Sequence, residues 1–300
     1  MGVTIDVALV ERLIARQFPQ YAHLPVSPVA NSGWDNRTFH LGTQLSVRLP
    51  SDPSYAPAVN KEQRWLPLLA KALPLPIPRP VGLGQPDSEY PSPWSIYEWL
   101  AGDIATSERV PDKTRLARDL ATFLNALHKI DPADGPQPAK YPGARGSSLA
   151  LVDSAVTRAV ADLQRSTPEF DRAAVEGIWQ DALAARWTGN ACWLHGDVAQ
   201  GNLLVRDGRL SAVIDFGCAA VGDPACDTCI AWTFLDAAGR AALQQVLALD
   251  DHDWARGRGW ALWKALIVVA GHIETNTLEA ASSATTLATL VADYHRRKSG

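Results

Sequence analysis

Residues 195–217 read HGDVAQGNLLVRDGRLSAVIDFG, and this stretch decides the fold. Two apolar runs, 203–206 and 210–216, flank the dipeptide Asp207-Gly208. Asp-Gly between apolar runs is typical of a tight turn that joins two antiparallel strands. The segment therefore predicts a hairpin with polar residues before its first strand and after its second.

The polar residues around this hairpin have the spacing of a phosphoryl-transfer site. Asp197 precedes Asn202 by five residues, and Asp215 opens an Asp-Phe-Gly sequence. In kinases an aspartate at the first position orients the attacking hydroxyl, while the asparagine and the second aspartate bind Mg²⁺. We expect the hairpin to return Asp215 to the side of Asp197 and Asn202. Each motif alone is common, and His195 alone would be a structural histidine, but an accidental match of the whole set is improbable.

At these residues the sequence resembles the aminoglycoside phosphotransferase family, which is related to choline kinases and more distantly to protein kinases. The match comprises HGDxxxxN from His195 to Asn202, IDFG from Ile214 to Gly217, and GDPxxD from Gly222 to Asp227. The resemblance extends in order over residues 25–275, and the central part is the most specific.

The resemblance implies an α+β fold of the bilobal, protein-kinase-like type. Residues 1–100 would form a β-rich N-lobe that binds the nucleotide. Residues 101–300 would form a mostly helical C-lobe with the catalytic loop, the metal site and the acceptor-binding helices.

The N-lobe matches are weaker. The strand at 45–49 carries Arg48 where protein kinases carry a phosphate-binding lysine, and Glu62 on the next helix is its expected partner. Arginine presents a planar fork where lysine presents a point charge, so the exchange is not neutral, although a fork binds phosphate in two-pronged fashion. The alternatives are a solvent-facing strand residue for Arg48 and an exposed helix residue for Glu62.

Two further nucleotide contacts rest on the resemblance. Ser32 and Asn36 belong to a polar loop that would lie over the phosphates, and an ordinary polar turn also explains this loop. Glu98 and Leu100 would offer backbone groups to adenine.

Composition limits the function classes. The chain has 300 residues, of which 47% are apolar, enough to fill a sizeable core. Its formal net charge of −4 argues against a nucleic-acid-binding protein. Residues 1–18 predict an amphipathic helix, and 261–271 are interrupted by Lys264, so we expect no membrane span and a cytoplasmic protein. Cys226 and Cys229 form a CxxC without a second pair, which disfavours a zinc or redox site.

Periodicity predicts the remaining elements. The N-terminal half should contain a hairpin (38–41 and 45–49), a helix from Val59 broken into two pieces at Pro67, an extended connection (73–93) and a strand (94–100). The C-terminal half should contain a helix (113–129), a loop (141–148), two helices within 149–186 and mostly helix over 224–297.

Together these patterns predict an ATP-dependent O-phosphotransferase that uses Mg²⁺ and phosphorylates a hydroxyl group of a small molecule. Aminoglycosides and related antibiotics are candidate acceptors, and GTP is the alternative donor. No protein partner is implied. The alternatives are a kinase of a metabolite such as choline or a sugar, and a non-catalytic nucleotide-binding or interaction protein on a kinase-like scaffold.

Overall fold

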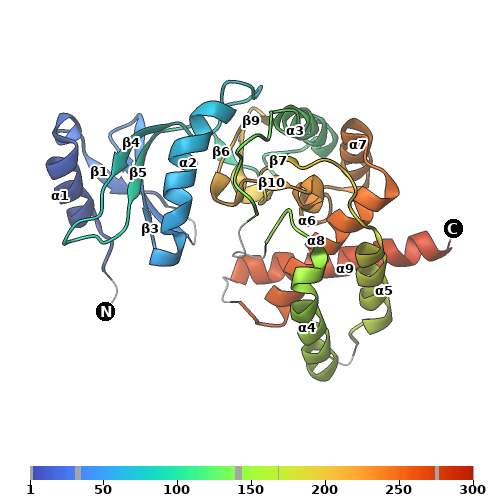
Figure 1. The fold of residues 1–300 in the computed structure, drawn as a ribbon. Helices are drawn as coiled ribbons and strands as arrows, with labels where there is room; N and C mark the ends of the chain where they lie inside the picture. Colours follow the sequence, from blue (N-terminus) through green and yellow to red (C-terminus); the bar gives the residue numbers. More distant parts are fainter. Residues whose placement is uncertain (1–2, 31–34, 139–143, 168, 274–276, 300) are drawn as a thin grey trace. The chain divides into compact units, whose positions relative to one another are not determined.

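The computed structural model describes residues 3–30, 35–138, 144–167, 169–273 and 277–299. The chain divides into two compact units, the first formed by Met1–Gly102 with Ala212–Gly217 and the second by Asp103–Ser211 with Cys218–Gly300. The first unit is built on a sheet and the second mainly on helices, which confirms the predicted α+β class (Figure 1).

The first unit contains a five-stranded antiparallel sheet with the order β1-β2-β3-β5-β4. Its strands are β1 (Val26–Pro28), β2 (Asn36–Leu41), β3 (Leu45–Pro50), β4 (Pro80–Gly84) and β5 (Trp94–Glu98). Two helices accompany the sheet, α1 (Val7–Gln17) and α2 (Ala56–Leu69), and they lie on opposite sides of it (Figure 1).

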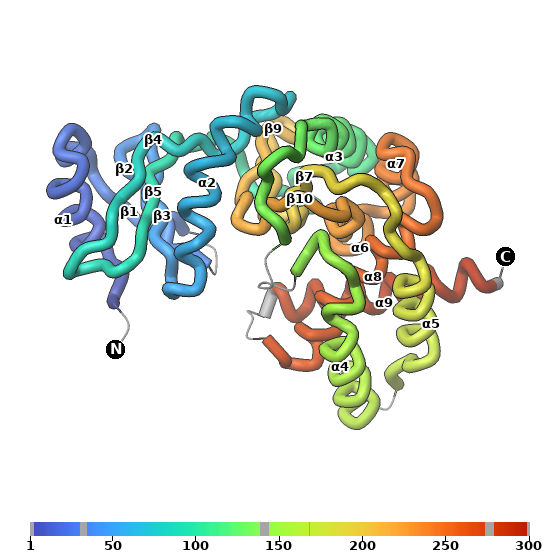
Figure 2. The backbone as a smooth tube through the Cα atoms, in the orientation of Figure 1, coloured from blue at the N-terminus to red at the C-terminus, as the bar shows by residue number. Residues whose placement is uncertain are grey.

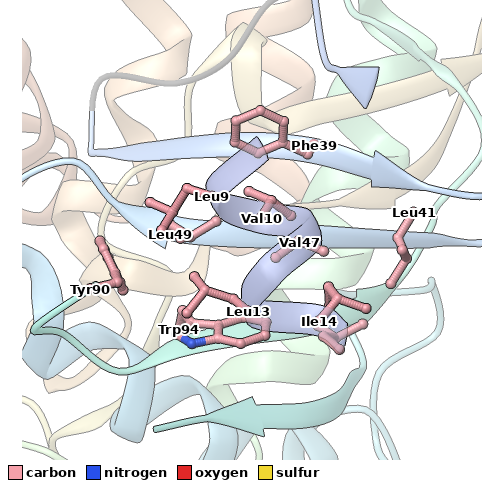
Figure 3. Close-up of a cluster of buried hydrophobic side chains, with 11 residues drawn as sticks. Leu9, Val10, Leu13, Ile14, Phe39, Leu41, Val47, Leu49, Tyr90 and Trp94 are labelled. Carbon is pink, nitrogen blue, oxygen red and sulfur yellow. The ribbon is translucent and has the colours of Figure 1, made fainter. Parts of the chain in front are cut away.

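Strand alternation explains why each helix covers one face. On β3 and β5 the apolar side chains of Val47, Leu49 and Trp94 pack against the buried face of α1 (Figure 3). Their sequence neighbours point to the opposite face, because successive side chains of a strand alternate. Arg48 and Tyr97 therefore face α2, where polar groups are placed.

Two sequence-based expectations for this unit are wrong. Helix α2 is continuous through Pro67. The proline lies two residues before Leu69, the last residue of the helix, so it disturbs only the final turn. The stretch 73–93 contains strand β4, whose Pro80 and Gly84 are residue types that favour turns but are tolerated on this edge strand.

The second unit is dominated by helices (Figure 2). They are α3 (Lys113–His128), α4 (Asp153–Ser166), α5 (Arg172–Ala184), α6 (Ile230–Thr233), α7 (Ala237–Leu247), α8 (Asp251–Val269) and α9 (Thr277–Ser299). An aspartate side chain accepts a hydrogen bond from the first turn at the start of α3, α5, α7 and α8. Such capping explains where these helices begin. The expected helices within 113–129, 149–186 and 224–297 are confirmed.

Short strands carry the central segment. They are β6 (Asp103–Ile104), β7 (Cys192–Leu194), β8 (Leu203–Arg206), β9 (Arg209–Val213) and β10 (Ala220–Gly222). Strands β6, β8 and β9 form one small sheet, and β7 pairs with β10 in another. The hairpin at Asp207-Gly208 is confirmed, although β9 ends at Val213, before Asp215. Among the described residues, no helix has the length and apolarity needed to cross a bilayer.

Candidate active site

The loop between β7 and β8 brings Asp197 and Asn202 into contact within the second unit. The side-chain nitrogen of Asn202 donates to the backbone oxygen of Asp197 at 2.9 Å and lies 3.4 Å from its Oδ2. Nδ2 therefore faces Asp197, and among the described residues no hydrogen bond reaches the amide oxygen of Asn202. The five-residue spacing thus joins the two side chains into one polar group.

Asp227 anchors the start of this loop. Its side chain is fully buried and accepts hydrogen bonds from the backbone nitrogens of His195 (2.8 Å) and Gly196 (2.7 Å). Asp227 lies in the short 3₁₀ helix Pro224–Cys229, which follows β10. The GDPxxD motif therefore fixes the backbone immediately before Asp197.

Gly196 is required by the backbone geometry of the loop. Its φ angle is +81°, and a Cβ atom at this position would lie 2.6 Å from the carbonyl oxygen of Cys218. Both facts exclude a side chain, which explains the glycine between His195 and Asp197.

Asp197 also has a partner that sequence reasoning missed. Arg145 donates from Nη1 to Asp197 Oδ1 in a short ion pair, with the two side chains 14% and 39% exposed. Burial acts to raise the pKa of Asp197, but Arg145, His195 and Lys264 outweigh it and lower that pKa below its ordinary value. Asp197 is therefore ionised at neutral pH. Arg145 lies in a loop with no periodic pattern, so no sequence signal marked it.

Lys264 of α8 contributes a second positive charge. Its Nζ forms an ion pair with Glu279 of α9 at 2.9 Å, and its charge helps to lower the pKa of Asp197. Two cations thus help to lower the pKa of Asp197. Arg145 pairs with Asp197 itself, and Lys264 pairs with Glu279.

A second polar group forms within the first unit, on the face of the sheet that α2 covers. The guanidinium of Arg48 lies 3.8 Å from Glu62 Oε1 and 3.6 Å from Asp215 Oδ1. Burial acts to lower the pKa of Arg48, but the two carboxylates outweigh it and raise that pKa. The structure therefore brings Arg48, Glu62 and Asp215 together, and neither Arg48 nor Glu62 is a surface residue.

Tyr97 completes this group and was not predicted. Its hydroxyl donates to Glu62 Oε2 at 2.5 Å, and both side chains are buried. Burial and the neighbouring Glu62 carboxylate raise the pKa of Tyr97 well above its ordinary value. Alternation along β5 could have identified it, because position 97 lies on the same face as Arg48.

The segment 212–217, which includes Asp-Phe-Gly, is held within the first unit at three points. Asp215 adopts a left-handed backbone (φ +67°) that is rare for a non-glycine residue. The Nζ atom of Lys61 donates to the carbonyl oxygen of Gly217 at 2.5 Å, and the backbone nitrogen of Val213 donates to Pro76 at 3.2 Å. Arg48 supplies the third contact, through the Asp215 carboxylate.

The other predicted nucleotide contacts are less defined. Ser32 lies outside the described residues. Asn36 begins β2, opposite Pro50 on β3. Glu98 ends β5, where its backbone nitrogen donates to Arg79 and that of Trp99 donates to Gln44. Leu100 follows two residues later and is half-buried.

The cysteines are free thiols. Burial raises the pKa of Cys229 to about 12, and it raises that of Cys226 well above its ordinary value. Thiols of this kind are protonated at neutral pH and are poor nucleophiles. Within the described ranges, no cluster of three or more His, Cys, Asp or Glu side chains could hold a metal ion.

Solved structures with the same fold include phosphotransferases. The GDP complex of aminoglycoside 2'-phosphotransferase-IIIa is 20% identical, covers 98% of this chain and 100% of its own, and has a TM-score of 0.69. The streptomycin-ATP-APH(2")-IIa ternary complex is 22% identical over 89% of this chain and 91% of its own, with a TM-score of 0.61. The macrolide 2'-phosphotransferase MphH from Brachybacterium faecium is 24% identical over 93% and 97%, with a TM-score of 0.59.

These likenesses confirm the predicted kinase-like fold. No curated protein matches the chain. A family model does match residues 27–260, which is most of the chain and includes every motif quoted above, so this protein belongs to the phosphotransferase enzyme family.

Proposed function

We propose that the chain is an ATP-dependent O-phosphotransferase that transfers the terminal phosphoryl group to a hydroxyl of a small molecule. The contact between Asp197 and Asn202 is the observation that carries this proposal. It places a carboxylate, ionised at neutral pH, beside an amide oxygen that faces away from it. A hydroxyl acceptor and a metal ion need these two groups side by side.

Asp197 would orient the acceptor hydroxyl. Phosphoryl transfer has a loose transition state with late proton loss, so alignment of the nucleophile matters more than a strong base. A carboxylate with a lowered pKa suits this role. We therefore assign Asp197 as the residue that aligns the hydroxyl and finally accepts its proton.

Asn202 and Asp215 would hold Mg²⁺. Asn202 would contribute its amide oxygen, since its Nδ2 is the atom that bonds to Asp197, and Asp215 would contribute its carboxylate. Hard oxygen ligands of this kind suit Mg²⁺. When bound, Mg²⁺ would neutralise charge on the nucleotide phosphates. Each of the two side chains carries an oxygen donor of the kind that Mg²⁺ prefers.

The first unit would bind the nucleotide. Arg48, kept in place by Glu62, offers guanidinium nitrogens to the non-transferred phosphates. Ser32 and Asn36 would lie near the phosphates. Adenine would contact Glu98 through its carbonyl and Leu100 through its backbone, because the Glu98 nitrogen already donates to Arg79.

The donor and acceptor rest on the relatives. One of these relatives is seen in complex with GDP and another with ATP, so both ATP and GTP belong in a test. The relatives are an aminoglycoside and a macrolide phosphotransferase, and such antibiotics are the first acceptors to test, followed by choline and sugars. Dependence on ATP also leads us to propose a cytoplasmic location.

A screen of nucleotide consumption tests the proposal. Mg·ATP and Mg·GTP are supplied with aminoglycosides, macrolides, amino alcohols and sugars, and phosphorylated product is identified by mass spectrometry. The matched variant is Asp197→Asn, which preserves the size of the side chain and should lower kcat by about 10²- to 10⁴-fold. Calorimetry should show that this variant still binds nucleotide. Product formation by folded Asp197→Asn at the wild-type rate would contradict the assignment.

A further inference from the structure

Among the described residues, Arg145 makes its hydrogen bonds around Asp197 through a single nitrogen, Nη1. Its Nη1 donates to the Asp197 carboxylate at Oδ1 and to the backbone oxygen of Gly196 at 3.0 Å. The same nitrogen lies 3.9 Å from the sulfur of Cys218, and the guanidinium carbon lies 6.0 Å from the centre of the Trp263 ring. Every one of these residues belongs to the second unit.

The turn that carries Arg145 is strained and firmly held. Ala144 and Gly146, on either side, have φ angles of +51° and +87°, and positive φ is unfavourable for alanine. The backbone oxygen of Gly146 accepts a hydrogen bond from Asp223 at 2.8 Å. A Cβ at Gly146 would lie 2.4 Å from Leu194, so the turn is packed closely against β7.

Strain of this kind persists only where the surroundings fix the conformation, and it is concentrated at functional sites. Arg145, 52 residues before Asp197 in the sequence, is thereby fixed so that one of its nitrogens donates to one of the two carboxylate oxygens of Asp197. Within the part of the chain that the structure describes, the other oxygen, Oδ2, has the 3.4 Å contact with Asn202 and no further hydrogen-bond partner.

We propose that Arg145 is a positioning residue for Asp197. It holds Oδ1, fixes the rotation of the carboxylate and leaves Oδ2 to accept the hydrogen bond of the acceptor hydroxyl. The inference rests on the proposed function, because it assigns a role within that reaction. A fixed carboxylate keeps the attacking oxygen in line, and misplacement by about 1 Å is enough to lower the rate by about 100-fold.

The test compares variants of the full-length chain. Arg145→Ala removes the contact, and Arg145→Lys retains a charge but not the planar fork. Arg240→Ala is the matched control, since Arg240 is a half-buried arginine that bonds the carbonyl oxygens of Ala231 and Leu235 away from Asp197. The measurements are kcat and KM for Mg·ATP, with kanamycin, a macrolide, choline and water as acceptors, and the melting temperature of each variant.

For Arg145→Ala we expect kcat to fall by about 100-fold with an unchanged KM for Mg·ATP. Arg145→Lys should recover part of the loss, and millimolar ethylguanidinium should raise kcat of Arg145→Ala but not that of the wild type. Arg240→Ala should lower the melting temperature without lowering kcat. If the role of Arg145 is purely structural, Arg145→Ala will behave like Arg240→Ala, with a lower melting temperature and an unchanged kcat, and ethylguanidinium will have no effect. This result would overturn the inference.

Failure of the two proposals would look different. A wild-type chain that turns over one of the four acceptors while Arg145→Ala is equally active overturns the role of Arg145 alone. A folded wild-type chain that turns over no acceptor of the full screen, with either Mg·ATP or Mg·GTP, overturns the proposed function, and the role of Arg145 falls with it.

Discussion

Glu62 is a buried carboxylate with few partners. Its side chain is 6% exposed, and Oε1 has no hydrogen-bond partner among the described residues. Tyr97 donates to the other oxygen at 2.5 Å, and Arg48 lies 3.8 Å away. Burial of a charge is unfavourable unless hydrogen bonds and an opposite charge compensate for it, so the Tyr97 hydroxyl supports the position of Arg48 indirectly.

Removing that hydroxyl should therefore be costly. We expect Tyr97→Phe to lower the free energy of unfolding by about 2–3 kcal/mol, since it leaves a buried carboxylate oxygen without its donor. Urea unfolding followed by circular dichroism measures the change.

Tyr90→Phe is the matched control. The Tyr90 hydroxyl is also buried but donates to a neutral group, the backbone oxygen of Pro50, at 2.6 Å. Its loss should lower the free energy of unfolding by about 1 kcal/mol. Equal losses in the two variants would show that Glu62 does not depend on Tyr97.

At the scale of elements, the 3₁₀ helix Pro224–Cys229 supports the catalytic loop through Asp227. Asn at this position has the same size but offers one acceptor oxygen for the two backbone nitrogens of His195 and Gly196. We expect Asp227→Asn to lower stability by about 2–3 kcal/mol and kcat by about 100-fold, because the backbone before Asp197 shifts. Steady-state kinetics and urea unfolding measure both effects.

Asp223→Asn separates stability from catalysis. Asp223 belongs to the same motif and is also buried, but its side chain pairs with Arg256 of α8 at 2.7 Å and accepts from the backbone nitrogen of Ala225. This variant should lose stability with a smaller change in kcat than Asp227→Asn. An identical kcat in wild type and Asp227→Asn would remove Asp227 from the support of Asp197.

The pairing of β4 with β5 depends on a glycine opposite a tryptophan. Gly84 faces Trp94 in the register, and a Cβ on Gly84 would lie 1.9 Å from the fully buried indole. We expect Gly84→Ala to lower the free energy of unfolding by about 1–3 kcal/mol, because the indole must leave its position in the core. Gly201→Ala, where nothing lies within 4 Å of the new Cβ, should leave the melting temperature unchanged. A wild-type melting temperature for Gly84→Ala would contradict the packing.

The elements were predictable where local pattern and tertiary structure agree. An apolar run beside a glycine-containing turn identified β3, an aromatic and apolar run identified β5, the spacing of leucines identified α3, and Asp207-Gly208 identified the hairpin. Strand β4 was missed because its sequence favours turns and only pairing with β5 makes it a strand.

The part of the site that could be predicted is the part whose residues lie close together in the sequence. Asp197 and Asn202 are five residues apart, so one loop suffices to join them. Arg145 reaches Asp197 across 52 residues, from a turn without periodicity, and Tyr97 acts through Glu62 across 35. Contacts of that sequence separation depend on the fold and leave no local pattern.

At the scale of the whole molecule, the first unit is discontinuous in sequence. It includes Ala212–Gly217, more than 100 residues after Gly102, where the main part of the unit ends. Lys61 and Pro76 hydrogen-bond to this segment, and Arg48 faces Asp215. The returning segment therefore contributes to the stability of the unit.

A fragment of residues 1–102 should accordingly be less stable than the same fragment joined through a flexible linker to residues 212–217. Two hydrogen bonds and an ion pair amount to about 1–3 kcal/mol, which urea unfolding can resolve. Asp215→Ala and Val213→Pro within the joined segment should reduce the gain. Equal stability of the two fragments would show that the segment only rests on the unit.

This discontinuity also limits how relatives of the protein can recombine. A single crossover after Gly102 would join the sheet of one parent to a C-terminal gene segment that encodes residues 212–217 of the other. The hybrid would then combine Arg48 and Lys61 with an Asp-Phe-Gly segment from a different background. Exchange of the complete first unit requires two separate stretches of the gene to be inherited together.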